Sequence, residues 1–241
     1  MKTSSNVLRA ALLSSIFQAS EALVGLSWTV SDVSSSGLTD ITFPISMPDA
    51  PHQSGYFFAQ QFNFNAQSDI GYTGLQPRPD SDSQPVIHAV FSSFISGTTT
   101  DDSNCSDGAD GGPGVSCSVD VTGPYTDGYL LKIQNTQGTT WTGTLVDATT
   151  GSETHIGTYT LPSGSGGIGG SQVGFVEYYP WNSGSHSCSA LPATSVTFGA
   201  PTTSSGNSGS IGKPYEYGDC VGKVGFSTQQ SGSDYTVNVG F

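Results

Sequence analysis

Positively charged residues are scarce in this chain. Its 241 residues include six Lys and Arg against 19 Asp and Glu, and the formal net charge is −13. Proteins that bind a phosphate backbone need a cluster of Lys and Arg, and the sequence contains no such cluster. We therefore expect neither nucleic acids nor anionic membranes as partners. We also expect the protein to be a monomer.

Charge of either sign and long apolar runs are also in short supply. Charged residues make up 10% of the sequence, whereas Gly alone contributes 32 residues. Exposed helix faces usually carry Lys and Glu in i,i+4 pairs, so this composition is atypical of helical proteins. A surface of hydroxyls and amides interrupted by glycine turns favours an all-β protein instead.

The N-terminus has the pattern of a secretory signal peptide. Lys2 and Arg9 accompany a short apolar run at residues 7–17, and small residues at Ser20 and Ala22 precede a suitable cleavage site. The run is too short for a membrane span, and a native amphipathic helix is the alternative. We predict that residues 1–22 are removed, that residues 23–241 form a single β-sandwich domain, and that the mature protein is secreted and extracellular.

The four cysteines of the chain are even in number, which in a secreted protein predicts two disulfides. Three pairings are possible, and we favour Cys105–Cys117 and Cys188–Cys220 because each pair encloses a segment rich in Gly and Ser. A zinc site is disfavoured, since no CxxC spacing occurs. Asn104 begins the sequence Asn-Cys-Ser, which has the form of a glycosylation site.

Alternation of apolar and polar residues with a period of two runs through most of the chain. It predicts about nine or ten short strands separated by turns, with no segment of helical period. This pattern indicates a two-sheet antiparallel sandwich of the jelly-roll or lectin-like kind. The expected strands are residues 56–65, 85–94, 129–135, 140–147, 155–161, 173–181, 194–199, 221–228 and 235–241.

Several segments of the chain occur in the order found in a known family. They are FNFNAQSDIGYTGLQPR, PVIHAVFSS, NCSDGADGGPGVSC, TWTGTLVD, QVGFVEYYPWN and YGDC, and the similarity spans roughly residues 56–241. Together they resemble a secreted bacterial and fungal family that is classed only as a domain of unknown function. The resemblance implies a β-sandwich, sometimes found beside carbohydrate-associated modules. It implies no established catalytic residues.

Glu177 is the best candidate for a catalytic acid, because few Glu occur in the chain. Glycoside hydrolysis needs two carboxylates on either side of the scissile bond. The neighbours of Glu177 on its own strand face, Phe175 and Tyr179, are aromatic, so a partner acid must come from another strand. The candidates for that partner are Asp69, Asp120 and Asp147. An ordinary strand residue is the alternative interpretation of Glu177.

His88 is a second catalytic candidate, because polysaccharide lyases on sandwich folds use a His or Tyr base. A core-strand histidine bonded to a neighbour is the alternative. Lyases of this kind also use an Arg or Gln that neutralises the substrate carboxylate. Arg78 lies between Pro77 and Pro79, so we expect it in a loop and not on a strand.

The acidic, glycine-rich loop at residues 98–116 is a candidate calcium site. Calcium is bound by six to eight oxygen ligands, which clustered Asp side chains and backbone carbonyls can supply. The candidate ligands are Asp102, Asp107 and Asp110. A solvated acidic turn held by a disulfide is the alternative, and no other cofactor is expected.

Binding of carbohydrate fits the composition better than any enzymatic reaction does. Aromatic rings stack on sugars, and amide groups bond their hydroxyls. The candidate ligand-binding residues are Tyr125, Tyr178, Trp181, Asn182, Tyr215 and Tyr217. We therefore predict a non-catalytic, lectin-like protein that binds an extracellular polysaccharide or a cell-surface glycan. The alternatives are an extracellular carbohydrate-active enzyme, either a glycoside hydrolase or a polysaccharide lyase, and a secreted host-interaction effector.

Overall fold

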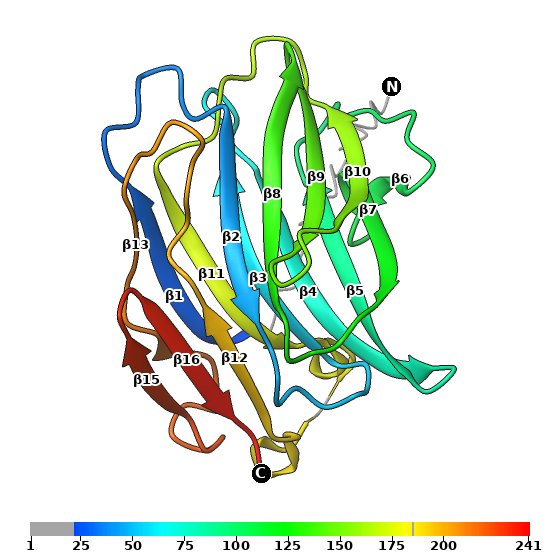
Figure 1. Cartoon of the computed structure of the whole chain (residues 1–241), viewed down its shortest axis with the longest axis vertical. Helices are drawn as coiled ribbons and strands as arrows, with labels where there is room; N and C mark the ends of the chain where they lie inside the picture. Colours follow the sequence, from blue (N-terminus) through cyan, green and yellow to red (C-terminus); the bar gives the residue numbers. More distant parts are fainter. Residues whose placement is uncertain (1–21, 185) are drawn as a thin grey trace, which may run out of the picture.

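Two antiparallel sheets pack face to face in the computed structural model, which describes residues 22–184 and 186–241 (Figure 1). The larger one, the nine-stranded sheet, carries the candidate site. Its strands in spatial order are β13 (Gly209–Ile211), β1 (Ala22–Val30), β11 (Ser171–Tyr178), β3 (Tyr56–Asn63), β4 (Ile70–Ser81), β5 (Gln84–Ser93), β7 (Gly112–Thr122) and β6 (Cys105–Ala109), with β14 (Tyr215–Glu216) also paired with β1.

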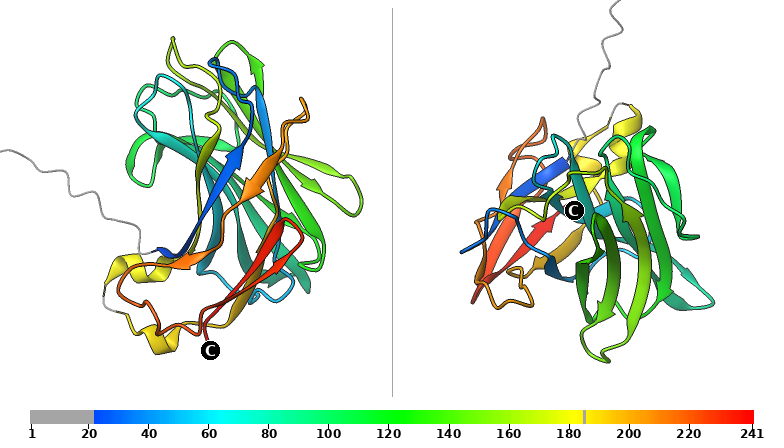
Figure 2. Two further views of the ribbon diagram at one scale, coloured as in Figure 1. Left: turned by 90° about the vertical axis from the view of Figure 1, so that its left-hand side faces the viewer. Right: turned by 90° about the horizontal axis from the view of Figure 1, so that it is seen from above.

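The second sheet has seven strands. In spatial order they are β10 (Glu153–Thr160), β9 (Thr140–Asp147), β8 (Gly128–Gln137), β2 (Asp40–Ser46), β12 (Thr194–Phe198), β16 (Asp234–Val239) and β15 (Ser227–Ser231). Two 3₁₀ turns, η1 (Tyr179–Ser183) and η2 (Cys188–Ala190), lie at one end of the sandwich, where the chain also ends (Figures 1 and 2). The predicted all-β sandwich is therefore confirmed.

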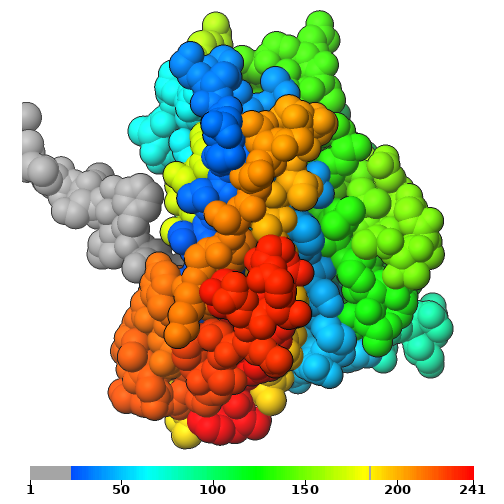
Figure 3. Space-filling view, turned by 60° about the vertical axis from the view of Figure 1, so that its left-hand side comes forward, coloured from blue at the N-terminus to red at the C-terminus, as the bar shows by residue number. Residues whose placement is uncertain are grey.

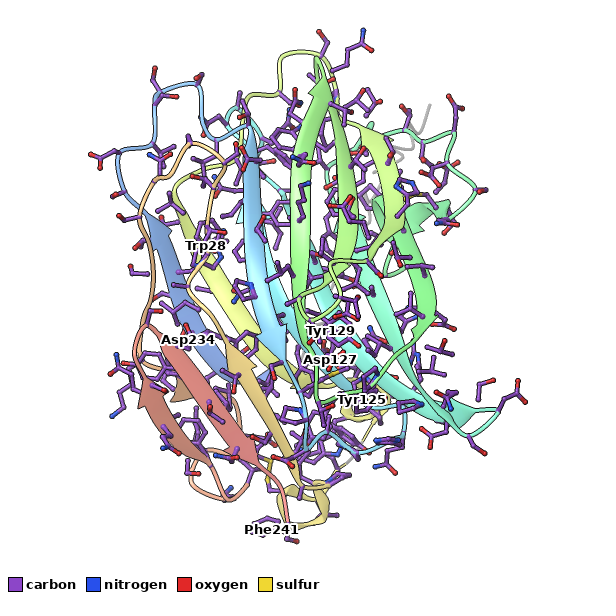
Figure 4. All side chains as sticks on the ribbon, in the orientation of Figure 1. Trp28, Tyr125, Asp127, Tyr129, Asp234 and Phe241 are labelled. Carbon is purple, nitrogen blue, oxygen red and sulfur yellow. A yellow bond between two sulfur atoms is a disulfide. The ribbon has the colours of Figure 1, made fainter. Side chains whose placement is uncertain are left out.

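The main core lies between the two sheets, because alternate residues of each strand point toward the other sheet. Trp28 of β1, labelled in Figure 4, contacts Phe43 of β2 edge-on at 5.2 Å between ring centroids. Phe91 of β5 stacks on Tyr159 of β10 at 4.3 Å. These four rings are fully buried and join the sheets across the sandwich.

The nine-stranded sheet also buries apolar side chains on its other face, which points away from the second sheet. We call this face the outer face. A sheet face that carries no second layer is usually polar. Here a separate apolar cluster occupies it, formed by Phe57, Ala59, Tyr72, Val90 and Phe175. The outer face thus has an aromatic floor on which a site can be built.

Both predicted disulfides are confirmed. Cys105 and Cys117 join directly paired residues of β6 and β7, and Cys188 and Cys220 join η2 to the segment that follows β14. Figure 3 shows the segment that carries β13 and β14, in orange, lying against β1, in blue. The second disulfide therefore ties this segment to the end of β11 through the two 3₁₀ turns.

Some strand predictions are wrong. The expected strand at residues 221–228 is mostly turn, and β15 begins at Ser227. Arg78 lies within β4 and not in a loop, although prolines flank it. The pairing of β4 with β3 ends at Leu75, so Pro77 lies beyond it, where the missing proline N–H donor removes no bond to β3.

The predicted signal peptide lies outside the described residues except for Ala22, which begins β1. Its cleavage and the single-domain boundaries remain predictions. Within the described chain, no helix has the length and apolar character needed to cross a membrane.

Candidate functional site

A row of polar residues crosses the outer face at right angles to the strands. Glu177 of β11 pairs with Phe57 of β3, and the β3–β4 register, with Phe58 opposite Leu75, places Gln76 on the other side of Phe57. Adjacent strands are about 4.8 Å apart, so the Cα atoms of Glu177 and Gln76 are separated by about 10 Å. The carboxyl group of Glu177 and the amide group of Gln76 therefore lie near each other on the outer face.

The ring of Phe57 turns away from the line that joins Glu177 to Gln76. A Cβ atom on Gly74 would lie only 2.6 Å from Cε2 of Phe57, so the ring lies over this glycine. There it meets Tyr72 and Phe175 edge-on, at 5.2 and 5.6 Å between ring centroids. The aromatic floor thus borders the row on one side.

Arg78 and Tyr179 border the row on its other side. Nη1 of Arg78 donates a hydrogen bond of 2.7 Å to the hydroxyl of Tyr179, and it lies 3.4 Å from Oγ of Ser54. The backbone N–H of Tyr179 donates to the carbonyl of Gly55 at 3.0 Å. Arg78 of β4 is thereby joined to Tyr179, the first residue of η1, which follows β11.

Glu177 is held where β11 ends. Pro180, early in η1, has no N–H to continue the ladder, and the 3₁₀ turn brings Asn182 back toward the strand. Nδ2 of Asn182 donates to Oε1 of Glu177 at 2.7 Å, and Glu177 is only 7% exposed. A buried carboxyl group is thereby given a fixed orientation.

Tyr217 lies close enough to Glu177 to sense its charge. Burial raises the pKa of Tyr217 to about 12, and the charge of Glu177 and the neighbouring Tyr215 add to this effect. The rings of Tyr215 and Tyr217 are 6.2 Å apart, and both are exposed at the surface. The β14 segment therefore supplies two tyrosines at the Glu177 end of the row.

The row continues beyond Gln76 with a His–Asp pair. His88 of β5 is opposite Gln76, and Asp120 of β7 is opposite His88. Nδ1 of His88 lies 2.6 Å from Oδ1 of Asp120. Burial lowers the pKa of His88, and the hydrogen bond to Asp120 works in the opposite direction. The predicted catalytic candidate His88 is thus on the same face as Glu177, with Gln76 and Phe57 between them.

A shallow pocket of about 310 Å³ adjoins the row on the side of the aromatic floor. Its lining residues come from β1, β3, β11 and the β14 segment, and they are Gly25, Gln61, Val173, Gly174, Phe175, Tyr215 and Tyr217. The ring of Tyr215 lies over Gly25, where a Cβ atom would be 2.8 Å from it. The pocket is therefore roofed in part by the tyrosine segment that is tied down by the Cys188–Cys220 disulfide.

Three of the six predicted ligand-binding residues are largely enclosed. Tyr125 is 3% exposed and bonds the backbone of Arg78 and Val86, which anchors the end of β4 (Figure 4). Trp181 is 9% exposed, and Tyr178 packs against it at 5.7 Å. Tyr125 and Trp181 belong to the main core and the half-buried Tyr178 packs against it, whereas Tyr215, Tyr217 and Asn182 lie at the site.

The predicted calcium ligands are dispersed. Asp102 accepts from the backbone N–H of Asn104 and lies 2.5 Å from Nε2 of His155, whereas Asp110 accepts from Tyr72. Asp107 is exposed on β6. Calcium binding by these residues stays a prediction.

Among the described residues, one group has ligand atoms close enough together to hold a metal ion. It is His186, Cys188, Asp219 and Cys220. The two sulfur atoms of this group form the Cys188–Cys220 disulfide, so they are not thiolate ligands in this structure.

Gln76 and Arg78 are the site residues that sequence reasoning missed. The period-two run of β4 places Tyr72, Gly74, Gln76 and Arg78 on one face, and this alternation was the available signal. The prolines at 77 and 79 obscured it.

Similarity to solved structures is found over most of the chain. Two crystal structures of scytalido-glutamic peptidase, one with a peptide-based transition state analog and one with a transition state analog inhibitor, each match 92% of this chain and 100% of their own. The identity is 16% and the TM-score 0.49 for both. A member of the eqolisin family of peptidases in complex with the tripeptide Ala-Ile-His matches with 13% identity and a TM-score of 0.44, over the same shares of the two chains.

No protein-family model matches the chain, and no curated protein sequence matches it. The resemblance to a domain of unknown function therefore stays a prediction.

The prediction of a non-catalytic carbohydrate-binding protein is corrected by these matches. The matched proteins are peptidases, and the ligand named for one of them is a tripeptide. The same finding contradicts the expectation that the chain is not an enzyme and the expectation of a polysaccharide or glycan partner. The burial of Tyr125 and Trp181 agrees with the correction, because it removes much of the expected aromatic platform.

Proposed function

We propose that this chain is a secreted peptidase in which Glu177 and Gln76 act together on the scissile peptide bond. The observation that carries the proposal is the register. It puts a buried, oriented carboxyl group and an amide group on one row of the outer face, with the Phe57 ring turned aside between them. The two disulfides and the predicted signal peptide support a secreted protein.

Glu177 is the acid–base group in this proposal. Its carboxylate takes a proton from a water molecule, and the oxygen of that water forms a bond to the carbonyl carbon of the peptide. The same proton then passes to the amide nitrogen as the C–N bond breaks, which releases an amine and a carboxylic acid. Asn182 fixes the orientation of the carboxyl group through Oε1.

Gln76 stabilises the negative charge that develops on the carbonyl oxygen. An amide N–H positioned toward that oxygen lowers the energy of the tetrahedral intermediate. The amide of Gln76 makes no hydrogen bond to any residue in the described parts of the chain, so its donors are available to a substrate.

The surroundings of the row can accommodate the side chains of a peptide. The floor beside the row is aromatic, and the adjoining pocket presents Phe175 and the rings of Tyr215 and Tyr217. Such a pocket can accept an apolar side chain of a peptide.

The proposal is tested by substitution of the two groups. The purified protein is incubated with a mixed peptide library between pH 3 and pH 6, and the products are identified by mass spectrometry. Glu177→Gln is expected to lower kcat/KM by at least about 100-fold, because it removes the acid–base group. Gln76→Ala is expected to lower kcat by about 100-fold through the loss of one oxyanion donor.

Matched controls lie on the other sheet. Glu153→Gln and Gln134→Ala change the same residue types on β10 and β8, and both are expected to leave kcat/KM within about twofold. The proposal is wrong if the wild-type protein cleaves no peptide under these conditions, or if Glu177→Gln retains the wild-type rate.

A further inference from the structure

Arg78 is the only Lys or Arg in the strands of the nine-stranded sheet. Its chain position puts it on β4 two residues after Gln76 and therefore on the same outer face. In a sequence with 19 acidic residues and a net charge of −13, a single cation placed beside the proposed reacting groups is a specific feature of the site.

The guanidinium group of Arg78 has no carboxylate partner among the described residues. Its recorded side-chain bonds go through Nη1 to the neutral hydroxyls of Tyr179 and Ser54. Two acids that flank this region are engaged by histidines: Asp80 lies 2.6 Å from His52, and Asp120 lies 2.6 Å from His88. Neither aspartate neutralises Arg78.

Most of the donor capacity of Arg78 is also unused. A guanidinium group has five N–H donors, and two of them form a fork that matches a carboxylate in a bidentate pair. Nε and Nη2 make no hydrogen bond to the described residues. The bond to Tyr179 holds the guanidinium group in place, so the fork is oriented before a ligand arrives.

The distance between Arg78 and Gln76 along β4 indicates where on a bound peptide this fork would act. Arg78 lies two residues from Gln76 along the strand, which corresponds to about 7 Å. An extended peptide covers the same distance in about two residues.

We propose that Arg78 binds a carboxylate of the substrate about two residues from the scissile bond. The inference rests on the proposed peptidase function and names its substrate class, a peptide with a carboxylate at that position. The carboxylate has two sources: an acidic side chain, or the α-carboxylate of a peptide that ends there.

A purely structural role for Arg78 predicts a different result. If the bond to Tyr179 only joined β4 to η1, removing it would lower the kcat/KM of all peptides by the same factor. A carboxylate-binding role changes the ratio between charged and neutral peptides, and it is this ratio that the experiment measures.

The first experiment compares peptides in pairs. Glu replaces Gln at each of three positions on either side of one cleavage site, and each peptide is made with a free or an amidated C-terminus. At pH 6 the Glu side chain, with an ordinary pKa of about 4.3, is ionised. We expect kcat/KM to be about tenfold higher for the Glu peptide than for the Gln peptide at one position about two residues from the scissile bond. If the carboxylate is instead the C-terminus, we expect the same difference between the free and the amidated peptide that ends at that position.

Arg78→Met keeps the apolar stem and removes the charge, so the ratio of kcat/KM between the Glu and Gln peptides is expected to fall to about one. Lys132→Met on β8 loses the same charge from the opposite sheet and is expected to keep the preference. The inference is overturned if no position shows a preference, or if the preference survives in Arg78→Met.

A binding measurement separates this inference from the proposed function. The same peptides are titrated by calorimetry into Glu177→Gln, which is not expected to cleave them. Tighter binding of the Glu or free-acid peptide, lost in the double variant with Arg78→Met, supports the carboxylate site even if the wild-type protein cleaves nothing. Cleavage by the wild-type protein with equal binding of charged and neutral peptides overturns the inference and leaves the peptidase proposal in place.

Discussion

Gly74 shapes the site through the side chain that it lacks. The ring of Phe57 occupies the position above it, and this placement keeps the ring away from the line between Glu177 and Gln76. The position of the Phe57 ring thus depends on the absence of a side chain at one residue, Gly74.

The variant Gly74→Ala is expected to damage both the fold and the site. Its Cβ atom would lie 2.4 Å from the carbonyl oxygen of Phe58, 2.6 Å from Cε2 of Phe57 and 2.8 Å from Cα of Ala59, so both the ring and the backbone of β3 must shift. We expect a loss of about 1–3 kcal/mol in the free energy of unfolding, measured by urea denaturation. Peptidase activity should fall by at least tenfold, because the displaced ring turns toward the row.

Gly128→Ala is the matched control, because a Cβ atom at that position would meet its nearest neighbour, Ala148, at an ordinary 3.7 Å. If Gly74→Ala has the stability of this control, the packing of Phe57 over Gly74 does not constrain the site.

At the scale of elements, the site is assembled where β11 ends and where the β14 segment crosses β1. Asn182 comes from η1, and Tyr215 and Tyr217 come from the segment that the Cys188–Cys220 disulfide ties to η2. The Cys105–Cys117 disulfide joins β6 and β7 at the far edge of the same sheet. The two crosslinks are therefore expected to differ in their effect on function.

Removing either disulfide by paired Cys→Ser substitution is expected to lower the free energy of unfolding by about 3–4 kcal/mol. The Cys188/Cys220 pair should in addition raise KM for peptides severalfold, because the tyrosines that roof the pocket lose their tether. The Cys105/Cys117 pair should leave KM unchanged in protein that remains folded. Thermal unfolding and steady-state kinetics measure the two effects, and equal KM values for both pairs would contradict the tether.

At the scale of the whole molecule, the dominant property is its negative charge. With a net charge of −13 and an isoelectric point near 4.2, the folded chain repels itself at neutral pH. Protonation of carboxylates near the isoelectric point removes this repulsion. The charge balance is therefore better suited to work in mildly acidic surroundings.

Salt should stabilise the protein at pH 7 and not at pH 4.2. Raising NaCl from 0.01 to 0.5 M shortens the screening length several-fold and weakens the repulsion between carboxylates. We expect Tm to rise by a few degrees at pH 7, which corresponds to a gain of about 1 kcal/mol. Calorimetry at both pH values measures the difference, and an equal response at the two would show that self-repulsion is not the cause.

The sequence by itself determined the class of the fold and its crosslinks. Period-two alternation and glycine-rich turns are local features, so they predicted the sandwich and about half of its strands, whereas β1, β2 and β7, for example, were not expected. The Gly- and Ser-rich segments enclosed by the cysteines led to the correct pairing. Glu177 was a sequence candidate because so few glutamates occur, and its catalytic role stays a prediction. Alternation failed at β4, where the prolines interrupt the signal although the strand continues.

Only the tertiary structure decided which residues surround Glu177. Gln76 and Arg78 lie about a hundred residues away in the chain, and they meet Glu177 through the pairing of β11 with β3 and of β3 with β4. Strand order and register depend on long-range packing, which no local pattern encodes. The aromatic residues around Glu177 were likewise divided between the core and the outer face by that packing, because a side chain's face depends on the register of its strand.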